Sequence, residues 1–367
     1  MDSSNLYSDL IFEILARSSL DTLDTCKLVC KDWNQLVYES NFLPTYCKNT
    51  TNVYGYFVQN LVSNRHVYEF VSLNYLPSGN NLTTIKIPTA TSDDDLNIQA
   101  SSKQGILCCV RRKGRECRYY VCKPSTRQWQ ALPNPKLRFR TLKVALVPQI
   151  GPDSGLRMLT INVTEVGGVF SKESRTDCYN YQCEIFHSKS WSWRKIEDIL
   201  LPFGAIFDNN QSVYANGLIY WLTTNCYVVA FNHEEETYYT FPLPELVCNN
   251  PNDSCKQLVE YKGKLGLICK PPKGHVQLWV LEDRQQHPIW NLIKEVNIDS
   301  LANEVSYPSP AGFYNAEIAL LKAFRKMIFY KLQDSSYNEI ELSDGLYFAD
   351  DVFPFRSDLE PINLRGE

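Results

Sequence analysis

Apolar residues recur at helical spacing near the start of the chain, at Leu10, Ile11, Ile14 and Leu15, with acidic residues between them. This pattern predicts a short amphipathic helix whose first turn is acidic. A second apolar series follows in steps of three and four residues and predicts another helix. Its members are Leu23, Cys26, Cys30, Trp33 and Val37.

Two or three helices in so short a segment bury too little apolar surface to be stable alone. The segment therefore either caps the rest of the chain or docks onto a partner protein. In this pattern Cys26 and Cys30 belong to the apolar stripe of the second helix. Residues Asn41 to Asn52 are interpreted as a linker, because Pro44 blocks a helix and the run after it is polar.

From Val53 onward the pattern changes to short apolar or alternating runs bounded by Gly, Pro, Asn or Ser, which is typical of β-strands. The runs repeat as units: an apolar strand opened by Gly, a second strand, a polar turn and then an aromatic residue. The units open at Gly55, Gly105, Gly155, Gly217, Gly263 and Glu317. The aromatic positions are Trp129, Trp193, Tyr239, Trp290 and Tyr337.

The spacing of both series is near fifty residues, and the single long step in each falls at the same place. An insertion within Val163 to Asn180 explains that step. A period near fifty with several strands in each copy indicates kelch-type propeller blades. The sequence thus predicts a mainly β fold with a small N-terminal α module and a β-propeller-like domain of six blades. An open β-sandwich, or two β-domains, is the competing fold.

The composition is that of a globular chain, with 44% hydrophobic, 21% charged and 13% aromatic residues. Residues 1–47 hold seven acidic and three basic side chains, which account for the whole net charge of −4. Without a basic excess, a nucleic-acid partner is not expected. No basic region followed by an apolar run opens the chain, and no eighteen apolar residues run together, so we expect neither a signal peptide nor membrane association. The thirteen cysteines are expected to be reduced thiols in a cytoplasmic and/or nuclear protein.

The N-terminal segment resembles the F-box, whose usual form is L-P-x-D-L-x-x-E-I-L, an apolar helix and then V-C-K-x-W. The matching residues here are Leu6 to Leu15, Leu23 and Val29 to Trp33. In that family the module is a small helical bundle that binds the Skp adaptor of a cullin-based ubiquitin ligase. Tyr7 stands where Pro is usual and Ser18-Ser19 where Leu-Pro is common. Because these positions contribute to adaptor contact in the family, the resemblance implies weaker adaptor binding here.

The second part of the chain resembles the plant F-box-associated domain. Tyr119 to Pro133 follows its Y-x-V-x-N-P-x-T-x-x-W-x-x-L-P block, with Lys123 in place of the usual Asn. Glu184 to Ser188, Trp193-Arg194 and the closing Phe353-Pro354-Phe355 also match. Together the two resemblances cover Leu6 to about Ile362. They divide the chain into an F-box module, residues 1–47, and a propeller-like substrate-recognition domain, residues 48–367.

Catalytic and cofactor chemistry finds little support in the sequence. There is no G-x-S-x-G elbow, no C-x-x-C pair and no glycine-rich phosphate loop, and the five histidines are scattered singly. We expect no catalytic residue, no metal site and no cofactor.

The resemblance implies a non-catalytic substrate receptor of an SCF-type ubiquitin ligase, with a Skp-type adaptor, a cullin bound through it, and an unknown target as partners. The adaptor-facing residues expected are Leu6, Leu10, Ile14, Leu20, Leu23, Val29, Cys30 and Trp33. Target contact is expected on loops of one propeller face. Candidates are the insertion around Gly167 to Asp177 and a basic hairpin tip formed by Arg111, Arg112, Lys113, Arg115 and Arg118.

Two alternatives remain open. The first is a propeller enzyme or ligand-binding protein that the N-terminal helices merely cap, which a polar, carboxylate-lined central pocket would favour. The second is an interaction scaffold outside any ligase, with a decayed F-box.

Overall fold

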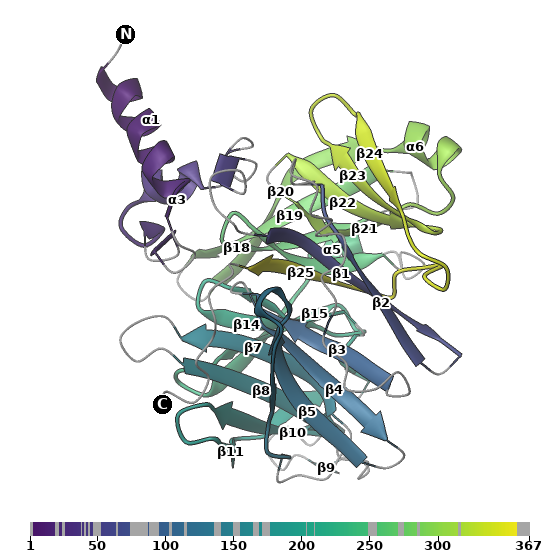
Figure 1. The fold of residues 1–367 in the computed structure, drawn as a ribbon. Coiled ribbons are helices and arrows are strands. Elements are labelled where there is room, and N and C mark those ends of the chain that lie inside the picture. Colours follow the sequence, from purple (N-terminus) through teal and green to yellow (C-terminus); the bar gives the residue numbers. More distant parts are fainter. Residues whose placement is uncertain are drawn as a thin grey trace.

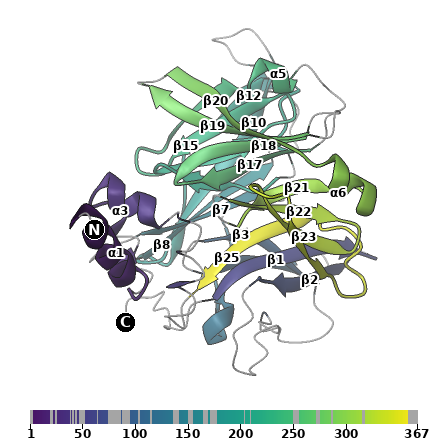
Figure 2. The same ribbon diagram turned by 90° about the horizontal axis from the view of Figure 1, so that it is seen from above.

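In the computed structural model, each antiparallel sheet of residues 53–357 takes one position in a closed ring of six blades (Figure 1). Two main helices precede the ring: α1 (Ser3–Leu15) and α3 (Lys31–Leu36). Both lie to one side of it (Figures 1 and 2). The structure describes residues 3–18, 22–23, 26–37, 39, 42, 45–46, 53–63, 65–73, 87, 95–102, 105–113, 116–135, 141–149, 155–163, 169–170, 177–202, 204–208, 210–248, 255–270, 275–284, 287–314 and 317–357.

Neighbouring strands run antiparallel in every blade. Blade one is ordered β25 (Asp351–Ser357), β1 (Val53–Val62), β2 (Arg65–Val71). Blade two is ordered β3 (Asp95–Ser101), β4 (Leu107–Lys113), β5 (Glu116–Lys123), β6 (Gln128–Ala131), with a 3-10 turn at Pro124–Thr126. Blade three is ordered β7 (Thr141–Gln149), β8 (Gly155–Val163), β10 (Asp177–His187), β11 (Ser192–Lys195), and β10 also pairs with β9 (Val169–Phe170) and β12 (Ile199–Pro202).

Blades four to six each have four strands among the described residues. Blade four contains β13 (Val213–Ala215), β14 (Leu218–Leu222), β15 (Tyr227–Asn232) and β16 (Thr237–Pro242), followed by helix α5 (Glu245–Cys248). Blade five contains β17 (Lys256–Tyr261), β18 (Lys264–Cys269), β19 (His275–Arg284) and β20 (His287–Asn297), followed by α6 (Asp299–Glu304). Blade six contains β21 (Ser309–Phe313), β22 (Ile318–Ala323), β23 (Lys326–Lys331) and β24 (Tyr337–Glu341). The six predicted blades are confirmed, and the sandwich alternative is wrong.

The repeat found in the sequence has a local cause in the backbone. All six unit openings lie within two residues of the first residue of a blade's second strand. Asn216 and Gly217 join β13 to β14 with φ values of 49° and 79°, and Lys262 and Gly263 join β17 to β18 with 51° and 79°. Two left-handed residues make the hairpin turn whose twist matches that of the strands. The aromatic positions lie in the outermost strands β6, β11, β16, β20 and β24, and the predicted insertion lies between β8 and β10.

The last strand closes the ring. β25 pairs with β1, so that Phe353 lies opposite Phe57 although the two are almost 300 residues apart in the chain. Blade one thus contains both ends of the propeller, and its inner edge is provided by the C-terminal strand. Closure leaves no open sheet edge at the junction, which protects the fold against edge-to-edge association.

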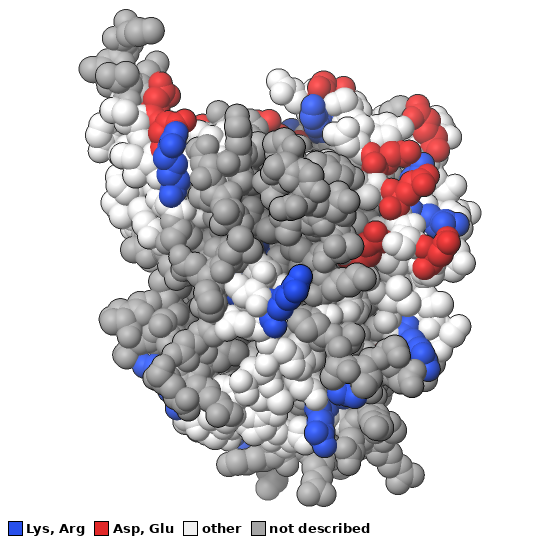
Figure 3. Space-filling view, in the orientation of Figure 1, with Lys and Arg blue, Asp and Glu red and all other residues white. Residues whose placement is uncertain are grey.

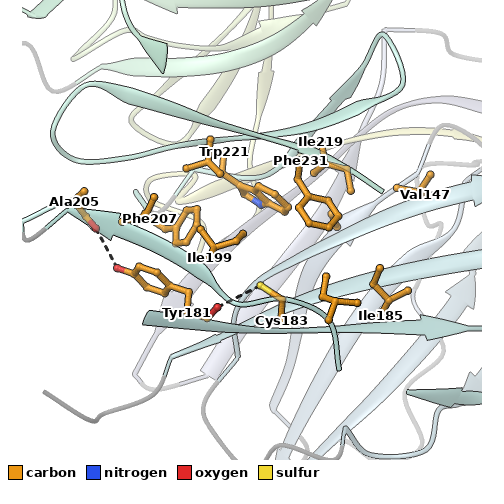
Figure 4. Close-up of a cluster of buried hydrophobic side chains, with 14 residues drawn as sticks. Val147, Tyr181, Cys183, Ile185, Ile199, Ala205, Phe207, Ile219, Trp221 and Phe231 are labelled. Carbon is orange, nitrogen blue, oxygen red and sulfur yellow. Dashed lines mark hydrogen bonds between the residues drawn. The ribbon is translucent and has the colours of Figure 1, made fainter. Parts of the chain in front are cut away.

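The hydrophobic core is divided into six clusters, one between each pair of neighbouring blades. Between blades three and four, Tyr181, Cys183 and Ile185 of β10 face Ile219 and Trp221 of β14 (Figure 4). Trp221 is fully buried there, and the Tyr181 hydroxyl donates to the Ala205 carbonyl at 3.2 Å. Alternation along each strand sends one set of side chains to each neighbour, so the six interfaces together hold the ring.

The N-terminal module differs from the sequence expectation in three respects. Helix α1 begins at Ser3 and has no acidic residue in its first turn. The second apolar series is not one helix, because the backbone leaves the helical conformation at Cys30 and α3 begins at Lys31. Phe42 and Tyr46, assigned to a linker, are each 1% exposed and belong to the module's own core.

No helix in the described part of the chain is long and apolar enough to span a bilayer.

Candidate functional site

Helix α1 presents two apolar stripes. Ile11 and Leu15 lie in the module's own core together with Leu23, Phe42 and Tyr46. Because one stripe already faces this core, a soluble helix is expected to be polar on its other sides. On one of these sides α1 and α3 do form a polar groove of about 590 Å³. Its lining includes the carboxylates of Asp9, Glu13, Asp32 and Glu39.

The other stripe is apolar and faces solvent. Tyr7, Leu10 and Ile14 are 64%, 57% and 59% exposed, and they follow one another at i, i+3 and i+7 along α1. In the turn before α3, Leu28 and Val29 are 82% and 61% exposed. We call these five residues the exposed apolar surface of the module. A cluster of this kind on so small a helical unit marks a protein-binding surface.

Leu10, Ile14 and Val29 of the expected adaptor set lie on this surface, and Cys30 is exposed beside it. Trp33 and Leu23 face inward: Trp33 is half-buried against the module's core and Leu23 is 1% exposed. Direct adaptor contact through Leu23 is therefore corrected, because its side chain is already used in the fold. Cys30 does not pack in an apolar helix stripe, which corrects that expectation as well.

Two further members of the set cannot be placed. Leu6 lies in α1, but its side chain, like the whole of Leu20, lies outside what the structure describes. Tyr7 and Leu28 are exposed apolar residues outside the expected adaptor set. Tyr7 departs from the family form, but its helical spacing from Leu10 and Ile14 places it in the same stripe.

The propeller has a second notable region, at the face where its inner strands begin. β25, β3, β7, β13, β17 and β21 form the inner ring, and each strand from β25 to β17 contacts the next one in this order. At their starting ends, hydrogen bonds run from blade to blade. Lys143 Nζ donates to the Asn210 carbonyl at 2.6 Å, and Asn210 Nδ2 donates to the Lys256 carbonyl at 2.7 Å. We call this side the strand-start face.

The same chain of bonds continues through the last blades. Lys270 Nζ donates to the Pro308 carbonyl at 2.9 Å, and Lys322 Nζ donates to the Ala349 carbonyl at 2.8 Å. In blade one, the Gln59 amide donates to Asn97 Oδ1 at 3.0 Å and to Asp351 Oδ2 at 3.3 Å. Buried polar side chains thus join neighbouring blades at this face.

Burial disfavours the charged forms of several side chains that join the blades at the strand-start face. Burial lowers the pKa of Lys143 to about 8, against the opposing attraction of Asp351 and Asp208. Burial likewise lowers the pKa of Lys322 and raises that of Asp351, although the Gln59 hydrogen bond and both lysines oppose the latter shift. These side chains form their hydrogen bonds with other groups of the protein. The described residues around the propeller axis therefore join neighbouring blades, and they include no set of converging carboxylates left open for a ligand.

The basic hairpin expected from the sequence is formed by β4 and β5, and its tip lies on the strand-start face. Arg111 and Arg118 are paired across it, with Arg118 exposed and Arg111 half-buried. Arg112 and Lys113 belong to β4, with side chains outside the described set, and Arg115 lies outside the described residues. Of the other target candidate, residues 164–168 and 171–176 are likewise outside it.

Among the described residues, no three His, Cys, Asp or Glu side chains lie close enough together to hold a metal ion. The twelve cysteines in the described part of the chain are all free thiols. Cys108, Cys109 and Cys269 are buried in strands, and burial raises the pKa of the Cys108 and Cys109 thiols well above the ordinary value.

Comparison with known proteins matches two parts of the chain to family models. Residues 3–45 match the F-box domain, and residues 61–306 match the F-box associated β-propeller domain. The F-box protein At5g49610 of Arabidopsis thaliana is 26% identical over 97% of both chains. The F-box protein At1g30790 of the same plant is 24% identical over 75% of this chain and 71% of its own.

Among solved structures, TolB from Acinetobacter baumannii is 10% identical over 89% of this chain and 73% of its own, with a TM-score of 0.47. That score is too low to carry an argument. The family matches rest on the sequence itself, and the propeller match covers more than half of the chain. The chain belongs to the F-box-associated β-propeller family and carries an N-terminal F-box.

Proposed function

We propose that this chain is the substrate-recognition subunit of an SCF-type ubiquitin ligase. Its F-box, residues 1–47, binds a Skp-type adaptor and, through it, a cullin. Its propeller, residues 48–367, holds a target protein for ubiquitination. The chain is not itself the catalyst in this proposal: it raises the local concentration of the target near the ubiquitin donor, which requires no active site in the receptor.

The observation that carries this proposal is the exposed apolar surface of the module. Its Leu and Ile side chains each favour burial by about 1.5–3 kcal/mol when fully removed from water. A partner helix covering Leu10, Ile14 and Val29 at once therefore gains several such contributions. The second, buried stripe of α1 keeps the module folded while the first remains available.

The arrangement of the propeller supports a target site away from the F-box. β1 starts at Val53, opposite Ser357 at the end of β25, so the chain enters the ring at the face opposite the strand-start face. Arg356 lies over the Tyr46 ring of the module, with its guanidinium 5.7 Å from the ring centroid. The strand-start face, with the basic hairpin tip of Arg111 to Arg118, is thus separate from the F-box attachment and suits an acidic segment of a target.

Titration of the full chain with a purified Skp-type adaptor tests the proposal. A Leu10→Asp/Ile14→Asp variant should lose at least about a hundredfold in affinity, because two charges then face an apolar partner surface. Leu246→Asp is the matched control, since Leu246 is 76% exposed on α5 of the propeller and should bind like the wild type. Failure of the intact chain to bind any of several adaptor paralogues would refute the proposal, provided that circular dichroism shows it folded.

A further inference from the structure

Blade six carries an exposed aromatic cluster at the strand-start face. Phe324, Tyr347 and Phe348 are 45%, 46% and 47% exposed, and Tyr307 is 80% exposed. They come from three connections: the β22–β23 turn, the segment between β24 and β25, and the segment between α6 and β21. We call these four residues the blade-six aromatic surface. Single exposed apolar residues are ordinary, but four aromatics from three loops at one place form a patch typical of an interface.

The cluster is held in place by backbone and ring contacts. Phe324 stacks on Tyr347 with ring centroids 6.2 Å apart and meets the Phe348 ring edge-on at 5.2 Å. The Arg325 amide donates to the Tyr347 carbonyl at 2.8 Å, and the Phe324 amide donates to the Ser306 carbonyl at 3.3 Å. The loops therefore present the rings in a fixed arrangement, which lowers the entropy cost of binding.

The charge around the cluster indicates the chemistry of the partner. Around the strand-start end of blade six there are five acidic side chains, Glu339, Glu341, Asp344, Asp350 and Asp351, and three basic ones, Lys322, Arg325 and Lys326. Figure 3 shows Asp and Glu side chains gathered where α6 and β24 lie in Figure 1. Some of the basic residues are already matched locally: Arg325 pairs with Asp344 at 2.6 Å and Lys326 with Glu339 at 2.8 Å.

The molecule itself shows that the rings accept a cation. The Arg325 guanidinium lies 5.8 Å from the centroid of the Tyr347 ring, within the range of cation–π attraction. An incoming Arg or Lys can contact the remaining ring faces while nearby carboxylates complement its charge. An acidic segment would meet repulsion at the same place.

We propose that the blade-six aromatic surface binds a basic segment of a protein partner, with Arg or Lys side chains placed on the rings of Tyr307, Phe324 and Phe348. That this partner is a ubiquitination target rests on the function proposed above. The binding itself does not require the adaptor, so the two proposals can fail separately.

Selection from a displayed library of random twelve-residue peptides, on the full chain without adaptor, tests the proposal. Peptides retained by the wild type should be enriched in Arg and Lys. Their affinity should fall at least tenfold in a Phe324→Ala/Phe348→Ala variant. Tyr239→Ala is the matched control, because Tyr239 is 45% exposed on blade four and its loss should leave affinity unchanged.

Three results would overturn the proposal: no Arg- or Lys-rich peptides among those retained, equal binding of such peptides by the double variant, or equal loss of their binding in Tyr239→Ala. A concentration-dependent dimer that the double variant abolishes would identify a second copy of this chain as the occupant instead. Cooperative thermal unfolding of the same double variant, at a midpoint close to that of the wild type, confirms that its propeller is intact.

Discussion

Lys143 is the residue at which burial and charge conflict most directly. Its pKa is about 8 in the folded chain and 10.5 when exposed, because burial disfavours the ammonium form. A lowered pKa contributes stability that is complete above the unfolded value and is lost as the pH falls through the folded value. Lys143 should therefore add up to about 3 kcal/mol to the unfolding free energy between pH 8 and 10.5.

Chemical denaturation of wild type and Lys143→Met at pH 7.5 and pH 10 measures this contribution as a difference of differences, in which other titrating groups cancel. The increase in the unfolding free energy from pH 7.5 to pH 10 should be smaller in Lys143→Met than in the wild type. Lys331→Met provides the control, since Lys331 lies exposed on β23 and should behave as the wild type. An identical increase in Lys143→Met and wild type would show that Lys143 is not desolvated in solution.

Gly55 shows why the same residue type serves different purposes in the repeat. A side-chain Cβ at this position would lie 2.4 Å from the Val71 carbonyl oxygen, which belongs to the paired strand and cannot move aside. Gly55→Ala should therefore destabilise the fold by about 1–3 kcal/mol. Gly312→Ala, also in a strand but with nothing within 4 Å of its Cβ, should be close to neutral in the same denaturation assay. Equal effects would rule out the close approach of β1 and β2.

The glycine pattern was visible in the sequence, but its causes were not. Gly217 and Gly263 are required by left-handed hairpin turns, a local property that recurs with the period of the blades. Gly55 is required by a neighbouring strand, which no local pattern reveals. Tyr7 departs from the family form, but its helical spacing places it beside Leu10 and Ile14 on the exposed stripe of α1.

Among the elements, β25 is the one on which closure of the ring depends. It supplies Phe353 and Phe355 to the core between blades one and two and Val352 to the core between blades one and six. A chain ending at residue 350 should lose cooperative thermal unfolding and associate through the exposed edge of β1. A chain ending at residue 357 retains β25 and should unfold as the intact chain does. A monomeric, cooperatively unfolding chain ending at 350 would contradict this role.

Short-range and long-range features of the fold differ in how well the sequence predicted them. Blade number and the order of strands within a blade follow from the repeat, because each hairpin joins neighbouring segments. The closing pair β1–β25 joins segments almost 300 residues apart, so the sequence left the sealing strand open. In the N-terminal module, Phe42 and Tyr46 were assigned to a linker because Pro44 lies between them, yet both pack into the core that Leu15 and Leu23 form.

At the scale of the whole molecule, the proposed function places the F-box and the strand-start face at opposite ends of one receptor. The exposed apolar surface of Tyr7, Leu10 and Ile14 is separated from the blade-six aromatic surface by the depth of the propeller, since β1 enters at the face opposite the strand-start face. Adaptor and target can therefore bind together, and neither should alter the affinity of the other by more than about twofold, because coupling requires a shared two-state element.

Light scattering after size exclusion measures the molar mass of the full chain mixed with a Skp-type adaptor and a cullin. If the chain is the proposed receptor, one complex should form that contains one copy of each protein. The Leu10→Asp/Ile14→Asp variant should remain a folded monomer beside the adaptor–cullin pair. An intact, folded chain that elutes separately from that pair would contradict the receptor function.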